Sequence, residues 1–210
     1  MSIKIKGIGN ISDNKIEGIA TIDGGSYENL SIDGVCTING DIETNRFDVD
    51  GTTTCEGNIV CKEMDCDGVV TIHGNVRSET IVIDGVVTVN GSKVEANRIE
   101  CDGVLSVQGQ ISADVIISDG FIKAQEIVGD EITIMSKRIS AFFKLFTPKR
   151  FKYSHVKLIE ATTVMLRYVQ ADTVSGQNVN IGPGCEIRRV DCSGELTVDP
   201  SATIEEVVQN

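Results

Sequence analysis

The sequence repeats a short unit with a nearly constant period. Asp-Gly pairs begin at Asp33, Asp50, Asp67, Asp84, Asp102 and Asp119. Successive pairs are 17 residues apart, except that Asp102 follows Asp84 after 18 residues. A second glycine keeps the same period at Gly40, Gly57, Gly74, Gly91 and Gly109, and GIATIDG at 18–24 is an earlier, weaker copy. A unit this short cannot bury an apolar face alone, so the copies must stack on one another.

Aligning the copies reveals columns whose chemistry stays constant. Apolar residues alternate with mostly polar ones on both sides of each Asp-Gly pair, which predicts two short strands. The first strand carries Leu30, Phe47, Met64, Ile81, Ile99, Ile116 and Ile132, then Ile32, Val49, Cys66, Ile83, Cys101, Ser118 and Ile134. The second carries Cys36, Thr53, Val70, Val87, Leu105 and Ile122, then Ile38, Cys55, Ile72, Val89, Val107 and Ala124, around an outward row of Thr37, Thr54, Thr71, Thr88 and Ser106. A third apolar column follows the second glycine at Ile42, Ile59, Val76, Val94, Ile111 and Val128.

Three short strands per copy, separated by two glycine corners and one looser corner, predict one coil of a three-sided parallel β-solenoid. Stacked coils pair their strands at about 4.8 Å per rung and share one aliphatic core. Glycine is expected at the corners because it adopts positive φ without a steric clash. The single longer spacing predicts one extra residue between Gly91 and Val94. We expect about ten coils, hence a rod of about 50 Å.

The pattern weakens after Ile134 and returns later in the chain. VDCSGELTV at 190–198 fits the register again, with Thr197 in the threonine row and Val207 opening the next coil. Between the two regions, apolar residues recur near every fifth position from Val164 to Val179. We therefore predict an N-terminal solenoid block over 1–135, a basic aromatic insertion over 136–155, and C-terminal solenoid coils over 156–210.

The composition agrees with a narrow, folded rod. Nine aromatic residues (Phe 6, Tyr 3, Trp 0) stand against 21 Gly, and no apolar run is long enough to cross a bilayer as a helix. The net charge of −12 argues against a nucleic-acid partner, because phosphate binding needs a basic surface. The start, MSIKIKGIGNISD, lacks the apolar region of a secretory signal, so a cytoplasmic location with reduced cysteines is expected.

Residues that could carry chemistry have simpler structural explanations. The seven cysteines form no C-x-x-C motif and five fall in apolar columns, which favours core packing over a metal or redox role. His73 occupies an outward position and lies far from His155 in sequence. The Asp-Gly row lacks the G-G-x-G-x-D motif of calcium-binding solenoids. The single threonine column is explained by cross-strand stacking. We therefore expect no catalytic residue, cofactor, metal or small-molecule substrate.

The segment SKRISAFFKLFTPKRFKY at 136–153 differs from the rest of the chain. It carries six basic residues and no acidic one over 137–152, and its apolar residues recur at i, i+3, i+4 and i+7, as on one face of a short helix that Pro148 would end. Three interpretations stay open: packing on the solenoid, contact with an anionic membrane surface, or contact with a protein partner. The candidate contact residues are Lys137, Arg138, Ile139, Phe142, Phe143, Lys144, Phe146, Lys149, Arg150, Phe151 and Lys152.

One stretch suggests an enzyme. VNIGPGCEI at 179–187 resembles one side of a coil in hexapeptide-repeat acyltransferases. Those enzymes have a strict hexapeptide period and an imidazole base, whereas this chain repeats its much longer unit over 14–131 and has no histidine near 179–187 in sequence. Acyl transfer is therefore an alternative to a structural function.

The repeated (apolar)-D-G-x-(apolar)-T-(apolar)-x-G unit, followed by a divergent half with V-x-I-G-x-x-C-x-I, resembles the bactofilins, a family of polymer-forming bacterial cytoskeletal proteins. The similarity extends over residues 14–208. It implies a right-handed, three-sided solenoid that polymerises end to end without nucleotide. The resulting filaments would support cell shape, motility or the positioning of partners.

Terminal coils of a solenoid are the natural place for such assembly, because they present unpaired strand edges and open aliphatic columns. The candidate end residues are Ile16, Ile19, Ile22, Val198, Ile204 and Val207. We hypothesise a non-enzymatic scaffold that forms a homopolymer in the cytoplasm. Whether residues 137–153 attach it to the inner face of the membrane is left open. A membrane-associated adaptor that does not polymerise is a further alternative.

Overall fold

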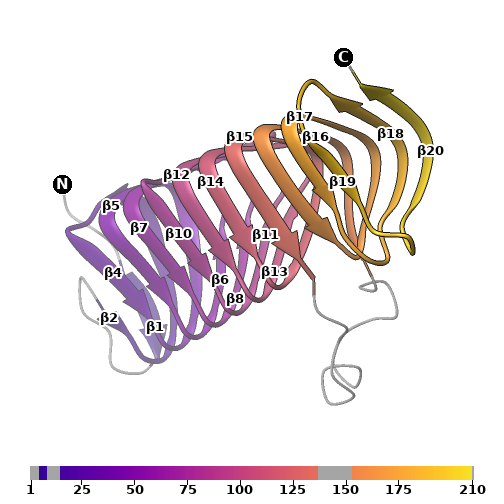
Figure 1. Cartoon of the computed structure of the whole chain (residues 1–210). Coiled ribbons are helices and arrows are strands. Elements are labelled where there is room, and N and C mark those ends of the chain that lie inside the picture. Colours follow the sequence, from indigo (N-terminus) through magenta and orange to yellow (C-terminus); the bar gives the residue numbers. More distant parts are fainter. Residues whose placement is uncertain (1–4, 9–14, 137–152, 210) are drawn as a thin grey trace.

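The computed structural model describes residues 5–8, 15–136 and 153–209. Its coils stack along one axis, and the two termini lie at opposite ends (Figure 1). Within these ranges every regular element is a β-strand, and every strand pairing is parallel except that of β1 with β3. The predicted parallel β-solenoid is confirmed.

The strands are short where a glycine corner interrupts the chain and long where it bends without a break. In the N-terminal half they are β1 (Ile5–Ile8), β2 (Lys15–Ile16), β3 (Ile19–Ser26), β4 (Asn29–Ile32), β5 (Val35–Val49), β6 (Thr52–Cys55), β7 (Ile59–Cys66), β8 (Val69–Ile72), β9 (Val76–Arg77), β10 (Thr80–Ile83) and β11 (Val86–Val89). They continue as β12 (Lys93–Cys101), β13 (Val104–Val107), β14 (Gln110–Ser118), β15 (Phe121–Met135), β16 (Ser154–Arg167), β17 (Val169–Ile181), β18 (Glu186–Cys192), β19 (Leu196–Val198) and β20 (Thr203–Gln209).

Each coil contributes one segment to each of three sheet faces, here named A, B and C in chain order. The inward column of face A defines coils one to eleven: Ile16, Ile32, Val49, Cys66, Ile83, Cys101, Ser118, Ile134, Leu166, Ile181 and Val198. Face B contains the threonine row, and face C contains the column that begins at Ile42. The solenoid thus has eleven coils, against the ten expected.

Two register predictions were wrong. Ile127, not Val128, continues the column of face C, because it pairs with Ile111 and is 0% exposed. Thr197 pairs with Asn180 on face A, not with the threonine row of face B. The second error arises because a later coil, from Val164 to Val179, is shorter than the N-terminal unit, so counting by the N-terminal period moves onto the wrong face. The extra residue before Val94 is confirmed by its pairing with Val76.

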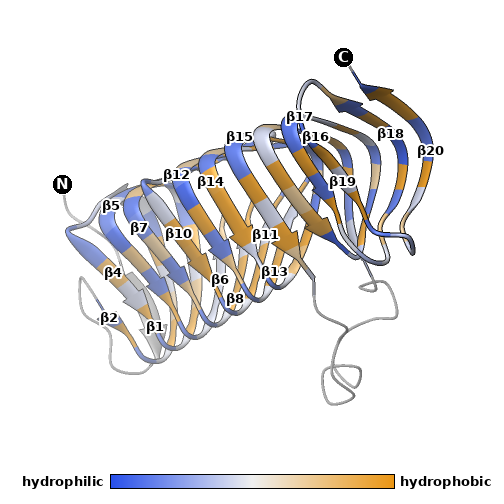
Figure 2. Ribbon diagram, viewed as in Figure 1, coloured by the Kyte–Doolittle hydropathy of each residue, from blue (hydrophilic) through white to orange (hydrophobic). Residues whose placement is uncertain are grey.

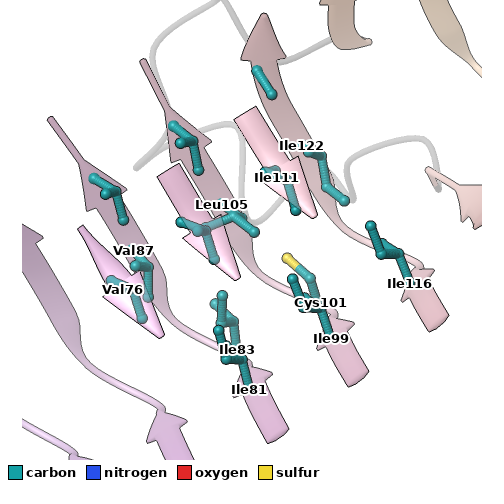
Figure 3. Packing of buried hydrophobic residues seen from close by; sticks show 14 of the residues in the cluster. Val76, Ile81, Ile83, Val87, Ile99, Cys101, Leu105, Ile111, Ile116 and Ile122 are labelled. Carbon is teal, nitrogen blue, oxygen red and sulfur yellow. The ribbon is translucent and has the colours of Figure 1, made fainter. Parts of the chain in front are cut away.

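The core is one continuous column of aliphatic side chains. Strands alternate hydrophilic and hydrophobic residues along their length (Figure 2), and the inward residues of successive coils pack on one another (Figure 3). All seven cysteines are buried, as core packing predicts. Burial raises the pKa of Cys36 to about 11 and those of Cys66 and Cys101 to about 12, so these thiols stay protonated and unreactive at neutral pH.

One inward position carries an unsatisfied polar atom. The Oγ1 of Thr53 is buried without a hydrogen-bond partner in the described part of the chain, whereas Val70 and Val87 occupy the same column in the next two coils. We expect Thr53→Val to raise the free energy of unfolding by about 1–2 kcal/mol, because it removes the cost of desolvating the hydroxyl. Urea unfolding would measure this. Thr54→Val, on the outward side, should change stability little, and a less stable Thr53→Val protein would contradict the prediction.

The glycines of the Asp-Gly corners are required for a different reason from the one expected. Among the described glycines only Gly25, Gly40 and Gly184 have positive φ, so the Asp-Gly corners do not depend on it. A Cβ atom on Gly68 would instead lie 2.0 Å from the carbonyl oxygen of Gly51, directly below it in the stack. Close stacking of backbone on backbone therefore excludes any side chain at this corner.

The corner between faces B and C is held by a ladder of side chains. Asp41 Oδ1 accepts the backbone N–H of Asn58, Asn58 Oδ1 accepts that of Asn75, and Asn75 Oδ1 accepts that of Lys93, at 2.7, 2.8 and 2.9 Å. One backbone amide per coil at this corner is thus satisfied by the side chain of the preceding coil. These residues lie one repeat apart in the sequence.

The solenoid continues across the position of the insertion. β15 pairs with β16 in register, and Ser136 and Ser154, which flank 137–152, are both buried. Their Oγ atoms lie 2.9 Å apart, Ser136 donates to the carbonyl of Gly120, and Ser154 accepts the N–H of Ile122. β16 begins at Ser154, so both ends of the segment 136–155 belong to the solenoid wall.

Candidate functional site

The C-terminal end of the solenoid exposes core positions. In coil ten Ile181 and Val190 are 0% exposed, whereas their partners in coil eleven, Val198 and Val207, are 40% and 48% exposed. Ile204, on face B of the same coil, is partly buried. β19 and β20 pair with the preceding coil on one edge, and no described strand pairs with the other. The last coil therefore combines an open aliphatic column with free strand edges.

The N-terminal end is different. Ile16 and Ile22, predicted as open end positions, are each only 1% exposed, and Ile19 is 62% exposed because it points outward from face B. β1 runs antiparallel to β3, pairing Ile5 with Ile22 and Ile8 with Ile19. Face B therefore has a strand already bound to its N-terminal edge. Of the six predicted end residues, Val198, Ile204 and Val207 are the ones that lie open at an end.

β1 was missed at the level of sequence. The predicted repeat begins at 14, although the preceding segment alternates Ile3, Lys4, Ile5 and Lys6. That alternation is the ordinary signal of a half-buried strand. It could have indicated an additional strand, but the reversed direction of β1 has no counterpart in a parallel repeat.

Face B is hollowed along its C-terminal half. A hollow of about 1000 Å³ is lined by side chains of both charges, among them Lys123, His155, Lys157, Asp172 and Arg188. His155 lies between Lys123 and Gln170 in the outward row, and Gln170 pairs in turn with Glu186. Two rungs thus separate the imidazole from the 179–187 stretch, which is far from it in sequence. In that stretch Ile181, Cys185 and Ile187 pack into the core, where they serve as solenoid wall.

The Asp-Gly corner forms an acidic row. Partial desolvation and the neighbouring carboxylates of Asp33 and Asp67 raise the pKa of Asp50, while Lys15 lies 3.2 Å from Asp33 at the N-terminal end of the row. Within the described residues no group of three or more His, Cys, Asp or Glu side chains could hold a metal ion. The carboxylates of this corner therefore repel one another and would repel other negatively charged groups.

The basic aromatic segment cannot be placed on this framework. Its candidate contact residues lie outside the described residues: Lys137, Arg138, Ile139, Phe142, Phe143, Lys144, Phe146, Lys149, Arg150, Phe151 and Lys152. The structure does locate the ends of the segment, which leave the solenoid at the corner between faces A and B of coil eight. Among the described residues, none lies in a helix long and apolar enough to span a bilayer.

Comparisons with known proteins give little to identify the chain. No family model matches it, and no solved structure matches it. A 49-residue stretch is 47% identical to the uncharacterized protein YhbE of Bacillus subtilis (strain 168), which corresponds to 23% of this chain and 21% of that protein. The chain thus aligns with about a fifth of the length of this relative.

Proposed function

We propose that this protein is a non-enzymatic scaffold that assembles end to end into filaments without nucleotide, in the manner of the bacterial cytoskeletal bactofilins that its repeat resembles. The observation that carries the proposal is the open last coil, where Val198 and Val207 are 40% and 48% exposed at positions buried in every preceding coil from coil two. In cells such filaments would support shape, motility or the positioning of partners.

The chemistry of the last coil favours another β-solenoid end as its partner. Free N–H and C=O groups along β19 and β20 can be satisfied together by strands that add to the same edges. Burying the aliphatic column at the same time contributes about 1.5–3 kcal/mol for each side chain that becomes fully covered. The surface charge of −12 on the whole chain opposes side-by-side clumping and does not oppose contact at an uncharged end column.

The opposite end has fewer free edges. β1 occupies the N-terminal edge of face B, while among the described residues nothing pairs with the N-terminal edge of β2 on face A. A second copy arriving here would pair on the remaining faces or displace β1. The C-terminal contact is therefore the stronger of the two, and filaments are expected to grow from units already joined at their C-terminal ends.

The test is negative-stain electron microscopy of the purified full chain at physiological salt with no nucleotide present. We expect filaments built from single solenoids joined end to end. A folded protein that remains monomeric across the accessible concentration range would refute the proposal. The same preparation tests the alternatives, since release of a thiol from acyl donors would indicate an acyltransferase, and a monomer that sediments with anionic liposomes would indicate an adaptor.

A further inference from the structure

Two of the three outward rows of face B carry no charge over its first six coils, while the third contains Asp23, Glu56 and His73. One outward row is formed by Ile19, Val35, Thr52, Val69, Val86 and Val104. The adjacent outward row is formed by Thr21, Thr37, Thr54, Thr71, Thr88 and Ser106. These twelve positions, named here the Val–Thr patch, contain no charged residue.

The rest of the surface in the same coils is charged and paired. On face A, Arg46 forms ion pairs with Glu63 at 3.0 Å and with Asp65 at 2.7 Å. On face C, Arg77 forms an ion pair with Glu95 at 2.8 Å. Face B itself becomes charged from coil seven onward, where Lys123 continues the threonine row. The Val–Thr patch is thus a bounded feature of one face.

Aliphatic side chains of the patch are open to solvent. Ile19 is 62% exposed, Val35 48% and Val69 45%, while Val86 is half-buried and Val104 is 6% exposed. Exposed apolar side chains that form one contiguous, flat area mark a contact surface more often than isolated ones do. The threonines beside them add methyl groups and no charge, so burial of the patch would leave no ion unpaired.

We propose that the Val–Thr patch packs face to face against the same patch of a second copy of this chain. Two sheets pack well when their side chains interdigitate, which requires the same spacing between rungs on both sides. A second copy has this spacing by construction, and its patch is equally flat and uncharged. The contact is lateral, so it is separate from end-to-end assembly and does not depend on it.

The size of the patch sets the strength of the contact. Six rungs give a length of about 29 Å and the two outward rows a width of about 14 Å, so two copies bury about 800 Å² in total. That area is smaller than a standard specific interface, which predicts weak pairing of single chains. Repetition along two filaments would strengthen it greatly, because every subunit contributes one contact.

The acidic corner beside the patch adds a salt dependence. Asp33, Asp50, Asp67 and Asp84 lie along its edge, each directly before the glycine that precedes the aliphatic row. Their like charges oppose the approach of two copies at low ionic strength. Association through the patch is therefore expected to increase with added salt, unlike a contact that depends on ion pairs.

A cysteine at the centre of the patch tests the proposal. All seven native thiols are buried, so a short bis-maleimide should react with an introduced exposed thiol in preference to them. Thr54→Cys is expected to give covalent dimers in the full chain, with a yield that rises with salt. Ser31→Cys, at a half-buried outward position on face A, is the matched control and should give few. Both are made in a Val207→Lys background to exclude contact through the C-terminal ends.

A matched pair of charge substitutions then isolates the patch. Val69→Lys on face B and Val60→Lys on face C replace side chains that are 45% and 44% exposed. Val69→Lys is expected to lower the dimer yield of Thr54→Cys about tenfold, and Val60→Lys to leave it unchanged. Unfolding midpoints of all variants confirm that they fold. The proposal is overturned if folded Thr54→Cys protein gives no dimer, if Ser31→Cys gives an equal yield, or if Val69→Lys has no effect.

Discussion

Replacing Val207 with lysine is expected to abolish filaments while leaving the solenoid folded. In the free chain the Val207 side chain is 48% exposed, so a lysine ammonium there stays in water. In a filament the same position would be covered as Val190 is in the coil before it, at 0% exposure. Burying an unpaired ammonium costs several kcal/mol, whereas covering the valine side chain it replaces contributes about 1.5–3 kcal/mol.

The neighbouring residue provides the control. Val208 lies on the same strand with its side chain directed outward, opposite Asp191 of the preceding coil, so Val208→Lys should still form filaments. Electron microscopy and sedimentation at physiological salt would compare the two variants, and circular dichroism would confirm that both fold. Filaments of normal length from Val207→Lys would exclude the C-terminal coil as the contact. Ile16→Lys is a poorer test, because Ile16 is 1% exposed and its replacement would unfold the first coil.

Substituting alanine for Gly68 is expected to destabilise the solenoid by about 3 kcal/mol, near the upper end of what overpacking usually costs. The added Cβ would lie 2.0 Å from the carbonyl oxygen of Gly51. That oxygen already accepts the backbone N–H of Val69 at 2.8 Å, so relieving the clash would lengthen a hydrogen bond between coils. The Gly51 oxygen belongs to the backbone, so it cannot move aside as the end of a flexible side chain would. The coils cannot separate locally without disturbing the whole stack.

Urea unfolding followed by circular dichroism would measure this effect. Asp67→Ala alters the preceding residue, which is exposed, and is expected to change stability little. If Gly68→Ala were as stable as the wild type, the stacking of corner backbones would not be the reason for glycine at this position. Hydrogen exchange would locate the weakened coils, since the stability of a repeat protein depends on contacts between neighbours.

The fold was predictable because each coil repeats the same arrangement of strands and corners. The inward columns are mostly Ile and Val, and a stacked parallel sheet is the arrangement that buries these columns. Prediction failed where the period changed or a residue acted outside it. Ile127, rather than Val128, is the inward residue of face C, and Thr197 lies on face A. Both differences arise because the coils after coil six do not all keep the N-terminal period. β1 was missed because it runs against the direction of the repeat.

The candidate site was only half predictable. Val198 and Val207 are open at the last coil, and Ile204 is partly buried there, because no described coil covers the inward pattern that extends to 207. Ile16 and Ile22 follow the same pattern at the other end but are buried. The Val–Thr patch needed the structure, since its aliphatic row is interrupted by Thr52 and only the pairing between coils shows that Val35 and Val69 lie on one flat surface.

The contact between Ser136 and Ser154 makes this corner of coil eight a suitable site for inserting another domain. Because the two hydroxyls meet at 2.9 Å and the ladder between β15 and β16 continues past them, the stack does not depend on the length of chain that leaves and returns there. Exchanging that segment for a longer one costs only the slowly growing entropy of closing a larger loop. A fluorescent domain carried at this corner would label the rod from its side and leave both ends free for assembly.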